Sequence, residues 1–320
     1  MSENTSFGFN HISVLLNESV DALKVRPGGV YVDGTLGGGG HSALICERLS
    51  GDGTLIGIDR DAAALSAAGE RLRKYACNIK TVHANFFDVK NVLSGLGIEA
   101  GGVDGAILDL GVSSPQLDNG ERGFSYNSNA RLDMRMNRDD ELDAYTVVNT
   151  YGEAELRQIL FKYGEEKNAA KIASNIVRAR EQKPIETTFE LSEIIKKSFP
   201  PKKRYGDKHP AKRSFQAIRI EVNHELDGLD KAVSDFVDVL KPGGVLAVIT
   251  FHSLEDRIVK NVFKELSQGC ICPKEFPVCV CGHKPRVKLI NRKPITADEM
   301  ELEYNNRAHS AKLRIVEKLS

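Results

Sequence analysis

Short strand-like runs alternate with helical patterns between Val30 and Leu110, and this alternation is the strongest constraint on the fold. The runs read VYVDGT, TLIGID, IKTVHA and GAILDL, and helices are expected between them near 41–49 and 61–74. Strands that are almost continuously apolar and joined by helices predict a parallel sheet covered on both faces, with right-handed crossovers. We therefore expect an α/β fold with a Rossmann-like sheet.

The strand pattern stops near Gln116 and returns only after Ile220. Between these points apolar residues recur at helical spacing, as in Leu156, Ile159 and Leu160. Beyond 220, an amphipathic helix precedes the breaking sequence KPGG and the buried strand VLAVITF, and a helix near 254–267 and a strand near 311–316 follow. These patterns predict one domain made of residues 1–115 and 221–320, interrupted by an inserted helical domain over 116–220.

The composition is that of an ordinary globular protein. Of 320 residues, 41% are hydrophobic, and 44 Lys and Arg balance 44 Asp and Glu, so net charge argues nothing about nucleic acid. The N-terminal apolar run Ile12–Leu16 is too short for a signal sequence or a membrane span. We expect a cytoplasmic protein without a membrane partner, in which Cys46 and Cys77 are packing residues and not a disulfide.

A glycine-rich turn, DGTLGGGGH from Asp33 to His41, follows the first predicted strand. Consecutive glycines permit positive φ and allow backbone to approach a ligand at the carboxyl edge of the sheet, although a tight turn without a ligand is the alternative. Asp59 ends the second strand, where a carboxylate can accept both hydroxyls of an adenosine ribose. Asp59 could instead cap the next helix, but Asp61 fits that role better.

Two features of the sequence distinguish S-adenosylmethionine from NAD as the predicted cofactor. The glycine string lacks the G-x-G-x-x-G spacing that aims helix amides at a dinucleotide phosphate. Carboxylates at the strand ends, Asp33, Asp59 and Asp109, suit a cationic ligand without phosphate, which favours S-adenosylmethionine over NAD. Ser114-Pro115-Gln116 also follows the fourth strand, where methyltransferases acting on base amines carry an Asn/Asp/Ser-Pro-Pro-aromatic turn. The match is partial, because the second proline and the aromatic residue are missing.

Longer motifs carry a resemblance to a known family. DGTLGGGGHS, LDLGVSSPQLD, ERGFSY, LDMRM, FKYGEE, HPAKRSFQAIRI, VITFHSLEDR and NNRAHSAKLRI occur in this order over nearly the whole chain. Together they resemble the MraW family of small-subunit ribosomal RNA methyltransferases. The resemblance implies a class I methyltransferase domain with a helical insertion that binds RNA. It also implies transfer of a methyl group from S-adenosylmethionine to the N4 amine of a cytidine in the decoding region of 16S ribosomal RNA, with that RNA or the small subunit as partner.

The resemblance also implies the site residues. The cofactor-binding positions are Gly39, Gly40, His41, Asp59, Phe86, Asp109 and Gln116. Phe86 follows the third strand, where an aromatic ring can stack on adenine, or where it can simply cover the edge of the core. For catalysis we hypothesise that Asp109, with Ser114 or nearby carbonyls, accepts the N–H bonds of the amine. The competing interpretation gives Asp109 to the cofactor alone. Either way the base must be single-stranded or flipped out.

Other charged segments are candidates for RNA contact. Residues 196–219 hold nine Lys and Arg against one acid, and 283–293 add five basic residues without an acid. Such clusters suit phosphate contacts, but a solvated face explains them equally well. His252, Glu255 and Asp256 follow the fifth strand and could reach the substrate, whereas a helix cap at Ser253 with surface acids is the alternative.

Cys270-x-Cys272 and Cys279-x-Cys281 could supply four thiolates to zinc. C-x-C is tighter than the usual C-x-x-C, and a reduced cysteine-rich hairpin explains the same residues, so no metal is predicted.

Two other classes of function compete with a methyltransferase. A non-catalytic RNA-binding assembly factor would bind no cofactor, and the intact glycine loop and Asp59 argue against it. An NAD-dependent oxidoreductase is disfavoured by the missing fingerprint. The residues of the predicted pocket do not distinguish cytidine from adenine N6 or a protein amide as the methyl acceptor. Only the resemblance selects cytidine. The sequence leaves the oligomeric state undefined.

Overall fold

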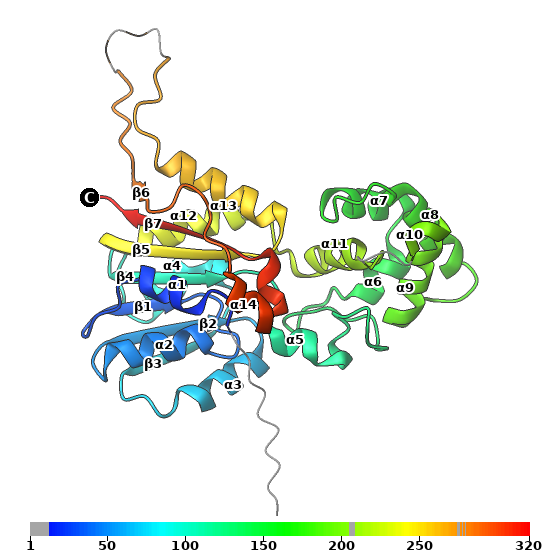
Figure 1. The fold of residues 1–320 in the computed structure, drawn as a ribbon, viewed down its shortest axis with the longest axis horizontal. Coiled ribbons are helices and arrows are strands. Elements are labelled where there is room, and N and C mark those ends of the chain that lie inside the picture. The colour runs from blue at the N-terminus through cyan, green and yellow to red at the C-terminus, as the bar shows by residue number, and fades with distance from the viewer. Residues whose placement is uncertain (1–12, 205–208, 274–275, 277, 279) are drawn as a thin grey trace, which may run out of the picture. The chain divides into compact units, whose positions relative to one another are not determined.

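A computed structural model describes residues 13–204, 209–273, 276, 278 and 280–320 (Figure 1). The chain divides into two compact units. One unit contains Met1–Gly111 and Gly228–Ser320, and the other contains Val112–Asp227. The domain boundaries predicted from the sequence lie near 115 and 221. We describe the two units separately.

The first unit is built on a seven-stranded sheet with the order β3-β2-β1-β4-β5-β7-β6 (Figure 1). The parallel strands are β1 Val30–Asp33, β2 Thr54–Asp59, β3 Asn78–His83, β4 Val103–Asp109 and β5 Leu240–Thr250. The last two strands, β6 Val287–Leu289 and β7 Lys312–Lys318, pair antiparallel. The predicted α/β fold with a Rossmann-like sheet is confirmed.

Two details at the far edge of the sheet differ from the expectation. β5 begins at Leu240 and so includes the KPGG sequence that was expected to break the chain before the strand. The pairing of β4 with β5 shifts register between Val103 and Gly105, which accommodates this early start. The short strand β6 was not predicted, because three residues are too few to show a periodic pattern.

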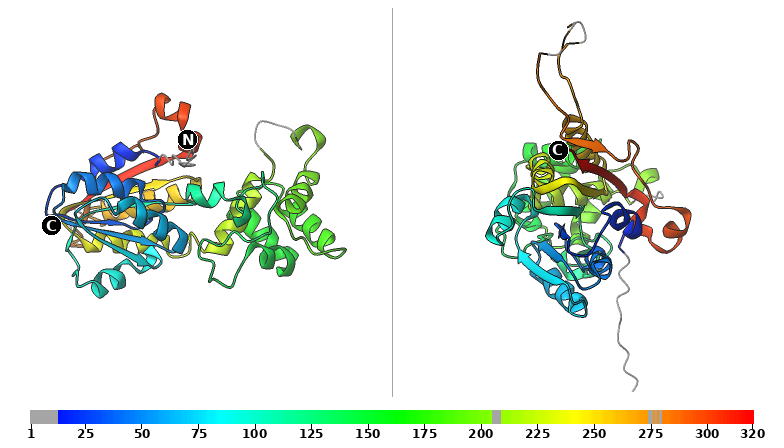
Figure 2. Two further views of the ribbon diagram at one scale, coloured as in Figure 1. Left: turned by 90° about the horizontal axis from the view of Figure 1, so that it is seen from below. Right: turned by 90° about the vertical axis from the view of Figure 1, so that its left-hand side faces the viewer.

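Helices cover both faces of the sheet. The helices form two groups, and within each group neighbouring helices contact one another (Figure 2). The first group contains α1 Leu16–Ala22, α2 Gly40–Leu49 and α3 Ala62–Leu72. The second contains α4 Val89–Gly95, α12 Leu229–Val239 and α13 Ser253–Leu266. Alternate strand residues such as Tyr31, Leu55 and Ile107 pack with the first group in one core. A short helix, α14 Glu299–Tyr304, precedes β7. No helix among the described residues has the length and apolar character needed to cross a membrane.

Cys46 and Cys77 lie in this core. Both thiols are free and buried, so the prediction that they are packing residues is confirmed. Burial and the neighbouring Cys77 raise the pKa of the Cys46 thiol far above its ordinary value. A thiol held in this neutral form is unreactive.

The second unit is helical. It contains α5 Ser114–Asp118, α6 Ala144–Thr150, α7 Glu153–Lys162, α8 Ala169–Arg180, α9 Thr188–Lys197, α10 Pro201–Arg204 and α11 Lys212–Asn223. Its apolar residues at helical spacing, including Leu156, Ile159, Leu160, Ile172 and Ile176, are buried as that spacing requires.

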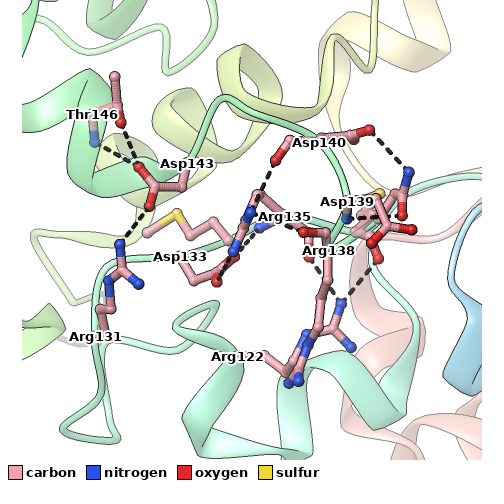
Figure 3. A network of polar contacts seen from close by, with 12 residues as sticks. Arg122, Arg131, Asp133, Arg135, Arg138, Asp139, Asp140, Asp143 and Thr146 are labelled. Atoms are coloured by element: carbon pink, nitrogen blue, oxygen red, sulfur yellow. Dashed lines mark hydrogen bonds and ion pairs between the residues drawn. The ribbon is translucent and has the colours of Figure 1, made fainter.

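The ERGFSY and LDMRM motifs form a polar network inside this unit (Figure 3). Arg135 donates two hydrogen bonds to the carboxylate of Asp133, at 2.8 and 3.0 Å. Arg122 donates to the carbonyls of Arg135 and Met136. Met134 between them is fully buried with a φ of 61°, so the side chains on either side hold a backbone conformation that methionine rarely adopts. These motif residues therefore fix the loop that leads to α6.

Candidate functional site

The carboxyl ends of β1, β2 and β4 place three carboxylates at one edge of the sheet. Asp33, Asp59 and Asp109 are the last residues of these strands, and β1 lies between β2 and β4. In open parallel sheets ligands bind outside the carboxyl ends of the strands. The geometry therefore puts a candidate ligand site above β1, bordered by acidic groups.

The glycine loop between β1 and α2 runs along this edge. Gly37 and Gly39 have φ values of 49° and 72°, which favour glycine. A Cβ on Gly40 would lie 1.9 Å from the Oγ of Ser13, and one on Gly39 would lie 3.2 Å from the Cβ of Ala68, whereas Gly38 borders open space. Packing thus explains why glycine is required at 39 and 40. That their backbone also contacts the cofactor stays a prediction.

Asp33 anchors the start of this loop from within the protein. It is 2% exposed, and its carboxylate accepts from Ser42 Oγ at 2.7 Å and from Thr35 N at 3.2 Å. Burial raises the pKa of Asp33 to about 6, and these hydrogen bonds offset only part of the effect. Asp33 is therefore a structural carboxylate whose negative charge destabilises the folded state at neutral pH.

Replacing Asp33 with asparagine should stabilise the protein above pH 6. A pKa raised from 3.8 to about 6 corresponds to about 3 kcal/mol. Because the folded state binds the proton more tightly, wild-type stability is full below pH 3.8 and falls as the pH rises to 6. Urea unfolding at pH 5 and pH 8 should show that the advantage of Asp33→Asn grows with pH.

Asp104, near the start of β4, provides a control in which the expected change in stability has the opposite sign. Although burial opposes the effect, ion pairs with Lys241 and Arg26 lower its pKa. Asp104→Asn should therefore destabilise the protein at pH 8. An Asp33→Asn protein that is less stable than wild type at pH 8 would contradict the role given to Asp33.

Asp59 ties the glycine loop to the end of β2. Its Oδ2 accepts from Gly37 N at 2.7 Å, and its Oδ1 accepts from Asp61 N at 2.8 Å. The backbone N–H of Arg60 also hydrogen-bonds to this carboxylate. A carboxylate offers about four lone-pair positions, so capacity for a ligand hydroxyl remains. Asp61 accepts from Ala63 N and is the N-cap of α3, as predicted, whereas the ribose contact of Asp59 stays a prediction.

Asp109 carries an acceptor that the described residues leave unused. Its Oδ1 is buried and has no hydrogen-bond partner within the described residues. Its backbone N–H donates to Thr35 Oγ1 at 2.6 Å, which locks the end of β4 to the glycine loop. Burial raises the pKa of Asp109 well above the ordinary value, and the charges of Asp33 and Glu255 raise it further. A buried acceptor without a partner is costly, which agrees with a ligand at this oxygen, and the role of Asp109 stays a prediction.

His41 lies beside Asp109 and is itself buried. It is 5% exposed, and its Nε2 lies 3.1 Å from the carbonyl of Val14. Since a carbonyl only accepts, Nε2 carries the proton, and Nδ1 faces Asp109 Oδ2 at 3.8 Å. Protonated His41 would therefore form an ion pair with Asp109. The structure brings His41 and Asp109 together, as the sequence predicted.

Phe86 opens the 3-10 turn η1 Phe86–Asp88 directly after β3. Its ring meets Phe87 edge to face at 4.6 Å and lies 6.3 Å from the buried ring of Phe236. Phe86 itself is only partly buried. One part of the ring thus covers the core, and the remaining part is accessible for stacking, so both interpretations of this residue are compatible with its place.

Gln116 and Ser114 belong to the second unit, in or beside α5. The Oε1 of buried Gln116 accepts from Ser113 N at 3.0 Å, so this side chain has a local structural contact. Ser113 was missed by the sequence analysis, yet its Oγ is buried without a hydrogen-bond partner among the described residues. A sequence does not show burial, so no sequence signal pointed to the hydroxyl of Ser113.

The acids after β5 have structural contacts. His252 caps α13, and Glu255 accepts from the backbone N–H groups of Phe251 and His252 at 2.9 and 3.2 Å. Asp256 pairs with Arg314 at 2.7 Å and Lys312 at 3.1 Å. The alternative of a cap at Ser253 with surface acids is wrong, because the N-cap is His252 and both acids are buried. Asp256 is not free for a substrate, whereas buried Glu255 adds negative charge beside Asp109.

Comparison with known proteins decides the family. The model of the MraW methylase family matches residues 8–319. The chain belongs to the MraW methylase family. The ribosomal RNA small subunit methyltransferase H of Brevibacillus brevis is 53% identical over 98% of this chain and all of that protein. The protein of the same name from Clostridium botulinum is 57% identical over 97% of this chain and 99% of its own length.

Comparison with solved structures adds less to this assignment than the sequence relatives do. The rRNA methylase of Streptococcus thermophilus aligns over 97% of this chain and 99% of its own, with 12% identity and a TM-score of 0.42. This score is too low to support an argument. As a MraW methylase, the chain is a methyltransferase, and its methyl donor is S-adenosylmethionine.

The residues at the edge of the sheet fit this donor. S-adenosylmethionine carries a sulfonium, an ammonium and a ribose, and it has no phosphate. Asp59 and Asp109 are carboxylates that suit a hydroxyl or a cationic group, whereas the carboxylate of Asp33 is engaged by Ser42 and Thr35. The buried Oδ1 of Asp109 has no hydrogen-bond partner among the described residues. No phosphate-binding G-x-G-x-x-G spacing is present in the sequence.

Proposed function

We propose that this MraW methylase transfers a methyl group from S-adenosylmethionine to the exocyclic N4 amine of a cytidine in the decoding region of 16S ribosomal RNA. The names of the two relatives support a substrate in the small subunit. The observation that carries the chemistry is the buried, unpartnered Oδ1 of Asp109 at the carboxyl edge of the sheet. An amine nucleophile needs such an acceptor for its N–H bond.

Asp109 would orient the amine and draw away its proton. The lone pair of a cytosine amine is conjugated into the ring, so the nitrogen becomes nucleophilic only as an acceptor holds its N–H bond. When bound, S-adenosylmethionine supplies the electrophilic methyl group. Asp109 would take the N4 proton as the amine accepts that methyl group. Burial and the charges of Asp33 and Glu255 raise the pKa of Asp109, which strengthens it as a base.

Several of the other predicted site residues would hold the cofactor in this scheme. Asp59 would accept the ribose hydroxyls with its remaining lone pairs, and Phe86 would stack on adenine. His41 would hold the Oδ2 side of Asp109, so that Oδ1 stays directed at the amine. Ser114 as a second acceptor and Gln116 as a cofactor contact remain part of the proposal.

The helical insertion would contact RNA through its basic residues. Lys197, Lys212 and Arg213 are exposed, as phosphate contacts require. Arg219, in contrast, is held by a two-point ion pair with Glu225 at 2.8 and 2.9 Å and is removed from the predicted cluster. Lys208 and Asp207 lie outside the described residues. Because a paired base cannot reach an enzyme pocket, the target cytidine would be unpaired or flipped out.

The decisive assay uses labelled S-adenosylmethionine and small ribosomal subunits that lack the modification. Digestion of the RNA to nucleosides should yield labelled N4-methylcytidine. Free 16S RNA tested in parallel would show whether the assembled subunit is required. Label in N6-methyladenosine, or in protein, would replace cytidine as the acceptor, and cofactor binding without any transfer would leave the proposed substrate unsupported.

A further inference from the structure

The segment between α13 and β6 carries a cluster of thiols that the methyl-transfer site does not use. Its two described arms leave Leu266 and Val287 and project from the sheet (Figures 1 and 2). At their base, Arg286 N donates to Leu266 O at 2.7 Å. Further out, the Sγ atoms of Cys270, Cys272 and Cys281 all lie within 4.8 Å of one another.

We propose that Cys270, Cys272 and Cys281 bind a structural zinc ion that holds the two arms together. Zinc binds thiolate sulfur at about 2.3 Å in a tetrahedral site, which places two such sulfurs about 3.8 Å apart. The Sγ atoms of Cys281 and Cys270 are 3.8 Å apart. A disulfide needs about 2.05 Å, so the two sulfurs have the separation of shared metal ligands and not of a bond.

Backbone amides hold the sulfur atoms of the two arms in place. Ile271 N on the first arm donates to Cys281 Sγ on the second at 3.4 Å, and Val280 N donates back to Cys272 Sγ at 3.4 Å. His283 N also donates to Cys281 Sγ, at 3.5 Å. The reciprocal pattern fixes the ligands on both arms at once, as a metal site requires.

The described residues of this segment form no apolar core that could replace the metal. Ile271, Phe276, Val278 and Val280 are 56%, 51%, 70% and 73% exposed. Burial of side chains therefore contributes little to closing the arms. Small segments without a core are commonly held by a metal or by disulfides, and the sulfur separation argues against the latter. The sequence offers a fourth thiol at Cys279, which lies outside the described residues.

The first test measures zinc in protein that has been purified without a metal-affinity step. Elemental analysis should find about one zinc per chain for the full-length protein. Cys270→Ser, Cys272→Ser and Cys281→Ser should each bind zinc more than roughly 100-fold more weakly, since loss of a ligand exceeds the loss of its supporting contacts. Cys77→Ser is the matched control, because Cys77 is a buried core thiol, and it should keep the zinc.

A second measurement does not depend on how well the variants fold. Cobalt added to metal-free wild-type protein should give the thiolate charge-transfer band and the visible bands of a tetrahedral site. Thiol titration of the folded protein should then show Cys270, Cys272 and Cys281 protected with zinc and reactive without it. The proposal is overturned if reduced wild-type protein binds no zinc, or if all three serine variants retain it fully. Methyl transfer is not needed for either readout, so the outcome is independent of the proposed substrate.

Discussion

Asp109→Ala should lower kcat/KM for methyl transfer by roughly 10²–10⁴-fold, which is the usual contribution of a positioned proton acceptor. The substitution removes Oδ1, the buried acceptor without a partner, and also the Oδ2 that faces His41 Nδ1. Asp109→Asn should lose a similar amount, because an amide has the same shape but a far weaker base. The measurement is transfer of labelled methyl to small subunits at several pH values, and the wild-type rate should fall as Asp109 becomes protonated.

The cofactor affinity of these variants separates the two interpretations of Asp109. If Asp109 serves the amine, calorimetry should show nearly unchanged binding of S-adenosylmethionine while transfer is lost. A loss of affinity equal to the loss of kcat/KM would assign Asp109 to the cofactor alone. Asp104→Asn, at the other end of β4, is the control and should leave both quantities intact, since Asp104 pairs with Arg26 and Lys241. Wild-type transfer by Asp109→Ala would exclude both roles.

Asp59→Ala should weaken binding of S-adenosylmethionine by roughly 10²–10⁴-fold. Two hydrogen bonds from ribose hydroxyls to a charged acceptor contribute about 3 to 6 kcal/mol together. The substitution also frees Gly37 N, which donates to Asp59 at 2.7 Å and helps to fix the glycine loop. Calorimetric titration with S-adenosylmethionine gives the affinity, and thermal unfolding without the cofactor reports how much of the effect comes from the loop.

Asp61→Ala is the matched control for this variant. It removes a neighbouring carboxylate that caps α3, which should cost about 1 kcal/mol of stability and leave the affinity unchanged. Equal affinity losses in the two variants would mean that Asp59 acts only through local structure. Unchanged affinity in Asp59→Ala would remove the ribose contact from the proposed site.

The sequence by itself determined the framework of the first unit. Strand-like runs joined by helical patterns have few alternatives to a parallel sheet, because each apolar run must be covered on both faces. The same logic located the carboxyl edge, so Asp33, Asp59 and Asp109 could be placed together before any coordinates. Sequence also identified Asp61 and not Asp59 as the cap of the next helix, since a cap must precede its helix by one residue.

Only the tertiary structure decided which polar groups are already occupied. The sequence pattern of residues 196–219 could not show that Arg219 forms an ion pair with Glu225. In the same way, the motif at 252–256 could not show that Asp256 forms an ion pair with Arg314. Packing in the folded protein, and not the local sequence pattern, determines which charged side chains form an ion pair, whether the two residues are near or distant in sequence. Burial without a partner, as at Asp109 Oδ1, and the meeting of Cys270 with Cys281 likewise depend on the folded path. Local periodicity encodes which faces are buried, whereas the pairing of individual atoms depends on three-dimensional contacts.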